Sequence, residues 1–513
     1  MDIQGLKDKV LQLAIQGKLV DQCESDEPAS VLLERIKKEK EQLIKDKVIK
    51  KEKVLPEIGE DEKLFDLPRG WEWTKIYKIA FVTKLAGFEY TKYVAPNLDD
   101  KGTVKLIKGR NVKNGELNFD CEDKITLNTS QQLQRSALTK KCLLTPFVGS
   151  LGNIAIFDQC ERYHLGANVA KIELFNNKEI NLLEEYIKYY LLSLFGKKQL
   201  TKHSKSTAQE SISMQAIRDT IIALPPLEEQ KRIVAKVDEL FKLIDELDKN
   251  KQALLENITN MRNKVLQLAI QGKLVKQCEE DEPASVLLER IKKEKEQLIR
   301  DKVIKKEKAL PEIGEDEKLL FNLPRGWEWC RLGDIGQIIG GGTPSSTKKE
   351  YYSDKGIVWL TPADLRGYNG KYISKGSRYI TELGLQKSSA RMLPKGSVLF
   401  SSRAPIGYVV INNKELCTNQ GFKSVVPYNI KMNEYIYYFL NYNKKNIEEK
   451  ASGTTFKEIS GKGMCEIVIP IPPLKEQKRI VSKVDLIMNY LDKLQQEMES
   501  KEIVLKKAIL TEI

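Results

Sequence analysis

The most regular pattern in the chain is a heptad spacing of apolar residues in a long central segment. The apolar positions lie alternately three and four residues apart, and only Lys251 interrupts them. Pro226 and Glu228 are typical of a helix start, and Gly272 is suited to the left-handed conformation that ends a helix. The pattern predicts one helix of roughly 43 residues and about 65 Å, at ~1.5 Å per residue. Its apolar seam consists of Ile233, Val237, Leu240, Ile244, Leu247, Leu254, Ile258, Met261, Val265 and Leu268.

Both ends of the chain repeat half of this seam. The C-terminal segment matches its first half, and the N-terminal segment matches its second half. This predicts a pseudo-two-fold molecule in which the central helix pairs antiparallel with the C-terminal helix, while the N-terminal helix completes a second seam. The alternative is a set of unrelated surface helices that bury their stripes on separate cores. The repeated positions are Ile480, Val484, Ile487, Leu491, Leu494, Met498 and Leu505 near the C-terminus, and Ile3, Leu6, Val10 and Leu13 near the N-terminus.

A second, nearly verbatim repeat begins within the last turns of the central seam and continues beyond it. Lys9–Leu64 returns as Lys264–Leu319 with 52 identities in 56 positions, and LPRGWEW then follows in both copies. Each copy contains an amphipathic helix with a densely charged outer face, which in the first copy starts near Asp26 and Pro28. A solvated arm and a docking arm for another subunit are both consistent with this composition.

Two variable regions, about 74–222 and about 330–470, share little sequence but the same order of elements. Short β-rich runs bounded by glycine and proline are followed by a helix, at Asn181–Phe195 and at Met432–Tyr442. We predict an α+β fold with two mixed α/β domains separated by long antiparallel coiled-coil helices in a pseudo-two-fold internal repeat. The predicted segments are an N-terminal helix (1–20), a charged arm (21–66), a first domain (67–222), a central helix (223–275), a second arm (276–321), a second domain (322–470) and a C-terminal helix (471–513).

The charge of the chain suits a polyanionic partner without proving one. There are 85 Lys and Arg against 72 Asp and Glu, which gives a formal net charge of +13. Loops of the variable regions place small hydroxyls, amides, Lys and Arg beside glycine, and such side chains hold phosphates and read base edges. The same residues populate turns in proteins of every kind. The loops are 108–113, 149–153, 165–171 and 201–209 in the first region, and 340–349, 361–366, 401–407, 418–423 and 452–460 in the second.

No catalytic constellation can be assembled. His164 and His203 are the only histidines, neither belongs to an HExxH motif, and no GxxxxGK[ST] phosphate loop exists. Eight cysteines without a CxxC pair indicate reduced, mostly structural thiols. The first residues lack the apolar core of a signal peptide, and no apolar run is long enough for a membrane span. We therefore expect a soluble, cytoplasmic protein that binds without catalysis.

The order of several segments resembles the specificity subunit of type I restriction-modification systems. These segments are LPPLEEQKRIVAKVDEL, IPPLKEQKRIVSKVDLI, AIQGKLV, LPRGWEW, GGTP, LFSSRAPIGY, TNQGFK and SGTTFKEIS. The resemblance covers essentially the whole chain. It implies that each variable domain is a target recognition domain for one half of an interrupted, asymmetric site in double-stranded DNA, and that the helices set the spacing. The long charged arm exceeds the minimal plan of that family.

The resemblance also implies partners for a chain that is not itself an enzyme. Two methyltransferase subunits would dock on the helices, and two motor-nuclease subunits would join through them. S-adenosylmethionine, ATP and Mg²⁺ would be bound by these partners, with no cofactor or metal on this chain. A helix of about 65 Å against a DNA turn of about 34 Å limits the half-sites to roughly two turns apart. A non-catalytic coiled-coil scaffold that joins two protein-binding domains, and a fused enzyme, are the rival interpretations.

Particular loop residues are predicted to contact DNA. Removal of a phosphate contact should weaken binding to all sequences, whereas a changed base reader should alter the preferred sequence. The basic residues predicted to meet phosphates or guanines are Lys108, Arg110, Lys113, Lys202, Lys205, Lys348, Lys349, Arg403, Lys423 and Lys457. The predicted polar contacts are Asn111, Asn153, Gln209, Thr343, Thr361, Asn419, Gln420 and Thr454.

Overall fold

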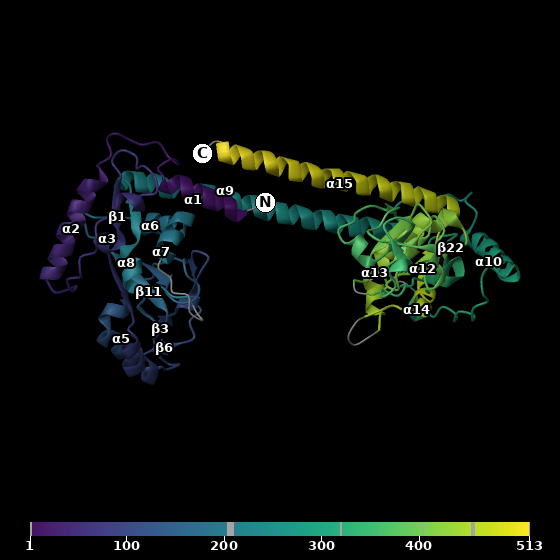
Figure 1. Cartoon of the computed structure of the whole chain (residues 1–513), viewed down its shortest axis with the longest axis horizontal. Helices are drawn as coiled ribbons and strands as arrows, with labels where there is room; N and C mark the ends of the chain where they lie inside the picture. Colours follow the sequence, from purple (N-terminus) through teal and green to yellow (C-terminus); the bar gives the residue numbers. More distant parts are fainter. Residues whose placement is uncertain (1–2, 203–209, 319–320, 404, 453–456, 512–513) are drawn as a thin grey trace. The chain divides into compact units, whose positions relative to one another are not determined.

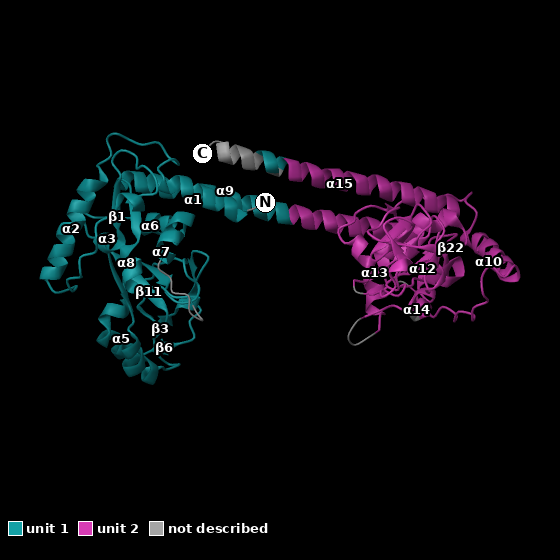
Figure 2. Cartoon of the chain, in the orientation of Figure 1, with its two compact units in different colours: residues 1–252, 501–513 teal, residues 253–500 magenta. Residues whose placement is uncertain are grey.

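The chain folds into two compact units. The computed structural model describes residues 3–202, 210–318, 321–403, 405–452 and 457–511. Unit 1 comprises residues 1–252 with 501–513, and unit 2 comprises residues 253–500 (Figure 2). The long helix α9, Leu227–Ile270, begins in unit 1 and continues into unit 2. Its 44 residues confirm the predicted central helix, and Gly272 takes the expected left-handed conformation with φ of 68°.

In unit 1, helix α1 (Ile3–Ile15) lies antiparallel to the first part of α9 (Figure 1). Lys7 forms an ion pair with Asp245 at 2.7 Å, whereas Asp26, further along the chain, pairs with Arg232 at 2.6 Å. As residue numbers rise on one segment they fall on the other, which is the signature of antiparallel packing. The apolar side chains buried in this contact include Leu6, Val10, Ile233, Val237 and Ile244.

The variable region of unit 1 is built from two four-stranded sheets and two smaller strand pairs. The first sheet has the order β2 (Ala80–Lys84), β11 (Val169–Leu174), β8 (Cys142–Pro146), β9 (Ala155–Phe157), and all of its pairs are antiparallel. The second has the order β6 (Lys124–Ile125), β3 (Val104–Ile107), β10 (Tyr163–Leu165), β7 (Ala137–Leu138). The pairs are β1 (Glu72–Lys75) with β12 (Ile221–Leu224) and β4 (Val112–Lys113) with β5 (Glu116–Leu117). The other α-helices are α2 (Ala29–Lys45), α3 (Ile76–Ile79), α4 (Gly87–Glu89), α5 (Leu127–Gln132), α6 (Glu184–Leu192), α7 (Leu194–Thr201) and α8 (Met214–Asp219).

Unit 2 has a similar plan, with five strands instead of four in its larger sheet and one smaller strand pair among its described residues. Its larger sheet has the order β14 (Gly336–Gly340), β22 (Lys423–Pro427), β19 (Val398–Phe400), β20 (Val409–Asn412), β17 (Tyr372–Ile373). The second sheet has the order β15 (Tyr352–Ser353), β18 (Tyr379–Ile380), β16 (Ile357–Leu360), β21 (Cys417–Thr418), and β13 (Glu328–Arg331) pairs with β23 (Val468–Ile471). The α-helices are α10 (Ala284–Arg300), α11 (Leu332–Ile335), α12 (Glu382–Gln386), α13 (Asn433–Glu449), α14 (Gly461–Cys465) and α15 (Leu474–Thr511).

Within unit 2, α15 lies antiparallel to the second part of α9 (Figure 1). Arg262 pairs with Asp492, and Asp281, which follows α9 in the chain, pairs with Arg479 at 2.6 Å. The predicted antiparallel pairing of the central and C-terminal helices is therefore confirmed here. Fewer of the predicted seam residues are buried than expected: Met261 is 51% exposed and Leu494 is 41% exposed. A straight helix drifts about 20° per heptad from an ideal coiled-coil repeat, which turns such positions away from the partner helix.

The charged arms lie on their units with one face. Ala29, Leu32 and Ile36 of α2 are buried, and so are the equivalent residues of α10. Lys40 of α2 donates a hydrogen bond to the Tyr77 carbonyl oxygen at 2.5 Å, with its ammonium group 5.5 Å from the Phe175 ring centre. Each arm therefore has a fixed inner face, while its outer face carries the repeated charges.

Candidate nucleic-acid interface

Backbone hydrogen bonds bring loops from distant parts of unit 2 together. The Gly342 amide donates to the Thr418 carbonyl oxygen at 2.9 Å, and the Asn419 amide donates to the Leu360 carbonyl oxygen at 2.8 Å. These bonds join the predicted loops 340–349 and 361–366 to loop 418–423. All three loops therefore meet at one end of the strands that carry them.

Two further loops reach the same cluster through Ser402. Its amide donates to the Gly421 carbonyl oxygen at 2.7 Å, and its carbonyl oxygen accepts from the Ile459 amide at 2.9 Å. Loop 401–407 therefore lies between loop 418–423 and the described part of loop 452–460. The five loops of unit 2 that were chosen from sequence thus form one loop cluster.

The glycines of this cluster have a steric role. A Cβ atom on Gly341 would lie 2.0 Å from the Asn419 carbonyl oxygen, and one on Gly342 would lie 2.2 Å from the Ala390 amide nitrogen. Only glycine allows the backbones to approach so closely. Gly341 and Gly342 therefore hold these backbone segments against one another.

A three-residue charge group lies in the loop cluster. Lys423 donates to Glu458 at 2.9 Å, and the same carboxylate lies 4.0 Å from the Arg403 guanidinium group. The side chains of Arg403 and Glu458 are 38% and 37% exposed, whereas that of Lys423 is 16% exposed. Two predicted DNA-contacting cations thus share one acidic partner at the surface.

The other predicted contacts of unit 2 divide by exposure. Asn419 is half-buried and accepts from the Gly421 amide at 2.9 Å, and the Thr361 hydroxyl donates to Asp364 at 2.8 Å. These two side chains are therefore engaged in loop structure. Thr454 lies outside the described residues. The exposed members are Thr343, Lys348, Lys349, Gln420 and Lys457.

The predicted residues of unit 1 lie on loops that also meet. The Gly109 amide donates to the Ala167 carbonyl oxygen at 3.0 Å, which joins loop 108–113 to loop 165–171. Loop 149–153 reaches the hairpin after β4, where Asn153 accepts from the Asn114 amide at 3.0 Å. Lys113 is exposed nearby. A second loop cluster is therefore formed in unit 1.

Acidic partners also face the cations of unit 1. Arg110 donates to Glu122 at 2.6 Å, a bond that raises the pKa of the Arg110 guanidinium group, and Lys108 pairs with Asp123. Asn111 is only 5% exposed, and its amide group donates to the Asn118 carbonyl oxygen at 3.1 Å. Its side chain therefore shapes the loop from inside.

The remaining predicted contact of this unit that the structure describes is Lys202. It is exposed and lies 3.4 Å from Glu62, a residue of the linker between α2 and β1. Lys205 and Gln209 lie outside the described residues.

Two charged residues at these clusters escaped the sequence analysis. Glu458 lies inside a predicted loop, but an acid is not an obvious partner for an anionic ligand. Lys84 ends strand β2, and its ammonium group lies 4.4 Å above the Phe147 ring. The available signal for Glu458 was its position inside predicted loop 452–460, whereas no element was predicted from sequence around Lys84.

The described residues hold no group of three or more His, Cys, Asp or Glu side chains placed to bind a metal ion. His164 is buried, both ring nitrogens lie within 3.3 Å of backbone oxygens, and burial lowers its pKa. His203 lies outside the described residues. All eight cysteines are free thiols. Among the described helices, none is both long and apolar enough to cross a membrane.

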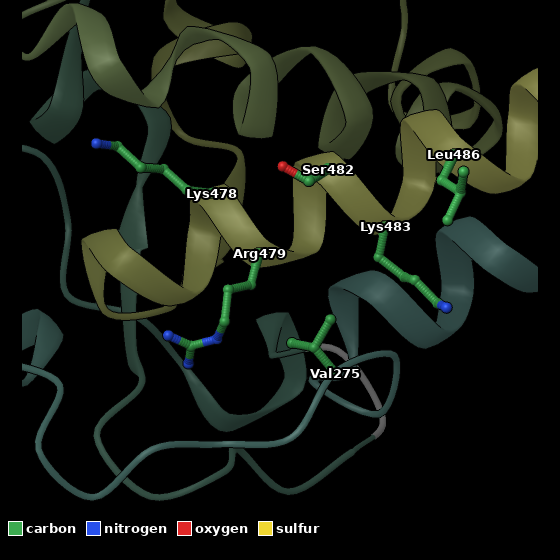
Figure 3. A pocket seen from close by; sticks show the side chains of 6 residues that line it. All are labelled: Val275, Lys478, Arg479, Ser482, Lys483 and Leu486. Atoms are coloured by element: carbon green, nitrogen blue, oxygen red, sulfur yellow. The ribbon is translucent and has the colours of Figure 1, made fainter.

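A separate surface feature lies on α15 of unit 2. Val275, Lys478, Arg479, Ser482, Lys483 and Leu486 line a shallow hollow of about 440 Å³. Figure 3 shows Arg479 and Lys483 extending from α15 on the side where Val275 lies. By the internal repeat, the corresponding positions of unit 1 are Val20, Lys231, Arg232, Ala235, Lys236 and Glu239.

Comparison with known proteins assigns the family. Residues 75–257 and 324–503 match the type I restriction modification DNA specificity domain. The EcoAI specificity subunit of Escherichia coli is 30% identical, over 96% of this chain and 90% of the relative. The EcoEI specificity subunit of the same species is 27% identical, over 98% of this chain and 91% of the relative.

A solved structure shares the fold. It comes from a study of complex assembly and conformational transition of the type I restriction-modification system, and it aligns with a TM-score of 0.53 and 22% identity. The alignment covers 87% of this chain and 98% of the other. The two matched domains, the paired helices and the similarity over almost the whole length agree: this chain is a non-catalytic DNA specificity subunit of the type I restriction-modification family.

Proposed function

We propose that each variable domain binds one half of a bipartite, asymmetric site in duplex DNA through its loop cluster. The observation that supports this most strongly is the meeting of five separate loops of unit 2 around Arg403 and Lys423. Duplex DNA presents phosphates and base edges to such a surface.

The proposed contacts are divided by whether a side chain is bonded within its own loop. Lys108, Arg110, Lys113, Lys202, Lys348, Lys349, Arg403, Lys423 and Lys457 meet phosphates or guanines, and Asn153, Thr343 and Gln420 read polar edges. Asn111, Thr361 and Asn419 act through loop shape, because their side chains are bonded within their loops. Lys205, Gln209 and Thr454 stay in the proposal on sequence alone.

The proposal is tested by Arg403→Ala and Lys423→Ala in the full chain, bound to its methyltransferase partner. Each variant should weaken binding to duplex DNA by about tenfold at moderate salt, and Lys423→Ala should also reduce the salt dependence of the affinity by about one phosphate contact. Binding titrations at several salt concentrations measure both quantities. Lys395→Ala, an exposed lysine outside the loop cluster, is the matched control. Unchanged affinity and salt slope in both variants would contradict the assignment and favour the protein-binding scaffold.

The chain is part of a type I restriction-modification complex, and we propose its composition. Two methyltransferase subunits bind the helices, and two motor-nuclease subunits join through them. S-adenosylmethionine, ATP and Mg²⁺ are then used by these partners in the cytoplasm, where the DNA is found. The repeat supports the paired stoichiometry, because both units present nearly the same helical surfaces.

The hollow on α15 is the proposed centre of one methyltransferase contact (Figure 3). Four of its six positions carry the same residue type in the unit 1 copy, and only Ser482 and Leu486 differ, being Ala235 and Glu239 there. Identical partners need equivalent surfaces, and the shared Lys and Arg favour an acidic docking face.

The proposed limits of the recognition domains are adjusted at one end. The sequence placed them at 67–222 and 322–470. Strand β12 pairs with β1 as far as Leu224, and β23 pairs with β13 as far as Ile471. We therefore extend the domains to these residues.

A further inference from the structure

The two recognition domains share a backbone arrangement that we call the crossing, in which the amide and the carbonyl group of one residue bond to two different segments. Their sequences do not reveal it. In unit 1 the Phe147 amide donates to the Asn168 carbonyl oxygen at 3.1 Å, and the Phe147 carbonyl oxygen accepts from the Ile212 amide at 3.0 Å. In unit 2, Ser402 makes the same two bonds with Gly421 and Ile459. Phe147 and Ser402 therefore occupy equivalent positions.

The neighbouring residues follow from the same register. Val148 forms a β-bridge with Ser211, and Arg403 forms one with Glu458. Two residues after Asn168 and Gly421, Ala170 of β11 pairs with Lys84 of β2, whereas Lys423 of β22 pairs with Gly340 of β14. Hydrogen bonds and strand pairing thus match five positions between the domains.

Side-chain chemistry differs at all five positions. Unit 1 has Lys84, Phe147, Val148, Ala170 and Ser211, and unit 2 has Gly340, Ser402, Arg403, Lys423 and Glu458. One backbone frame with fully exchanged side chains is what two domains need if they read different half-sites from the same docking position.

Glu458 stands out among these positions because its charge opposes an anionic ligand. It lies between Arg403 and Lys423, at 4.0 Å and 2.9 Å, and remains partly open to solvent. A carboxylate at a DNA surface is favourable only where it accepts a hydrogen bond, and the cytosine amino group is such a donor. Arginine pairs with the two acceptors of guanine on the neighbouring edge of the same base pair.

We propose that Arg403 and Glu458 together read one G·C pair in the half-site of unit 2, with Glu458 accepting from cytosine and Arg403 donating to guanine. This rests on the proposed function of the domain. Without DNA, Glu458 neutralises the two cations; on binding, Lys423 is released toward a phosphate. Unit 1 cannot read its half-site in this way, because Val148 and Ser211 offer an apolar surface and a hydroxyl group instead.

The test uses the full chain in complex with its methyltransferase partner and a library of randomised duplexes. The wild-type complex should select a bipartite sequence with a G·C pair at one position of one half-site. Glu458→Gln should reduce discrimination at that position alone by about tenfold, because an amide suits adenine as well as cytosine. The other half-site should be selected unchanged.

Matched variants separate this inference from the proposed function. Glu415→Gln changes an exposed carboxylate outside the five loops of the cluster, and it should select the wild-type sequence. An unaltered selection by Glu458→Gln, with Arg403→Ala and Lys423→Ala still weakening binding, would overturn the inference and leave the proposed function standing. If the wild-type complex selected no sequence, the proposed function itself would fail.

Discussion

At the scale of single residues, one buried cation in each unit binds the linker between the arm helix and the first strand, that is, between α2 and β1 or between α10 and β13. Lys75 donates to the Pro56 carbonyl oxygen at 2.8 Å and to Asp219 at 2.7 Å. Its counterpart Arg331 donates to the Pro311 carbonyl oxygen at 2.7 Å and to Glu317 at 2.8 Å. Both side chains are 2% exposed. Such buried charges persist because each donor finds an acceptor.

Glu317 provides a pH-dependent test of the contact between Arg331 and its linker. Hydrogen bonds from Arg331, and then from the Gly314 amide, lower the pKa of the Glu317 carboxyl group from 4.5 to about 2. A carboxyl group whose pKa is lower in the folded state stabilises that state at pH values above its unfolded pKa. The stabilisation is lost as the pH falls through the folded-state pKa. Wild-type protein should therefore exceed Glu317→Gln in stability at pH 7, and the difference should close between pH 4.5 and about 2.

Urea unfolding of the wild type and the variant across this pH range measures the difference. The control is Glu415→Gln, which replaces an exposed carboxyl group that has no part in the contacts of Arg331. A wild-type advantage that stayed constant down to pH 2 would contradict the role given to Arg331.

The residue scale is also where the sequence was least informative. Loop composition pointed to the loops that contain Arg403 and Lys423. Their pairing with Glu458 could not be predicted, because it requires three loops to meet through backbone hydrogen bonds. Asn111 was predicted as a contact by its type, and its burial follows from folding of its own loop. Side-chain pairing across long loops has no local signal in one sequence.

At the scale of elements, the heptad pattern predicted the helices well and their buried faces less well. Length, ends and antiparallel pairing of the central helix all agree with the structure. The predicted burial fails at one of two equivalent positions of the repeat, since Leu6 is 1% exposed but Met261 is 51% exposed. Helix α1 also contacts α6 and α7, so Leu6 is covered by helices that no heptad rule includes.

This pair makes a matched stability test. Leu6→Ala should destabilise unit 1 by about 2–5 kcal/mol, the usual cost of a cavity in a core. Met261→Ala should change the stability of unit 2 by less than ~0.5 kcal/mol, because an exposed side chain leaves no cavity. Denaturant unfolding monitored separately for the two units distinguishes the outcomes. Equal losses from the two substitutions would show that the seam is buried uniformly.

At the scale of the whole molecule, the chain combines a duplicated frame with two different domains. The charged arms, the helices and the strand pairs recur, with Arg232–Asp26 and Arg479–Asp281 ion pairs both at 2.6 Å. The exposed helical surfaces are thus offered twice. The sequence repeat predicted this duplication directly, whereas the common crossing inside the domains became visible only through backbone pairing.

The proposed docking surfaces predict a stepwise loss of partners. Lys478→Glu with Lys483→Glu should leave one methyltransferase subunit bound per chain, because an acidic face would be repelled from one surface only. Lys231→Glu with Lys236→Glu should do the same at the other surface, and all four changes should abolish binding. Native mass spectrometry of the reconstituted complex gives the stoichiometry.

The control for this experiment reverses the charge of two exposed lysines in the second domain. Lys395→Glu with Lys414→Glu should retain two methyltransferase subunits, since neither lysine belongs to the helices. Two bound subunits after all four helical changes would exclude these surfaces as the docking sites.

The paired strands at the base of each domain have a consequence for how such proteins diversify. The chain enters the first domain opposite the point where it leaves, since Glu72 pairs with Leu224, and Glu328 pairs with Ile471 in the second. A segment whose two ends are adjacent can be lengthened, shortened or replaced without displacing what precedes or follows it. New sequence preferences can therefore arise by exchange of a whole insert, while the surfaces that assemble the complex stay under separate selection.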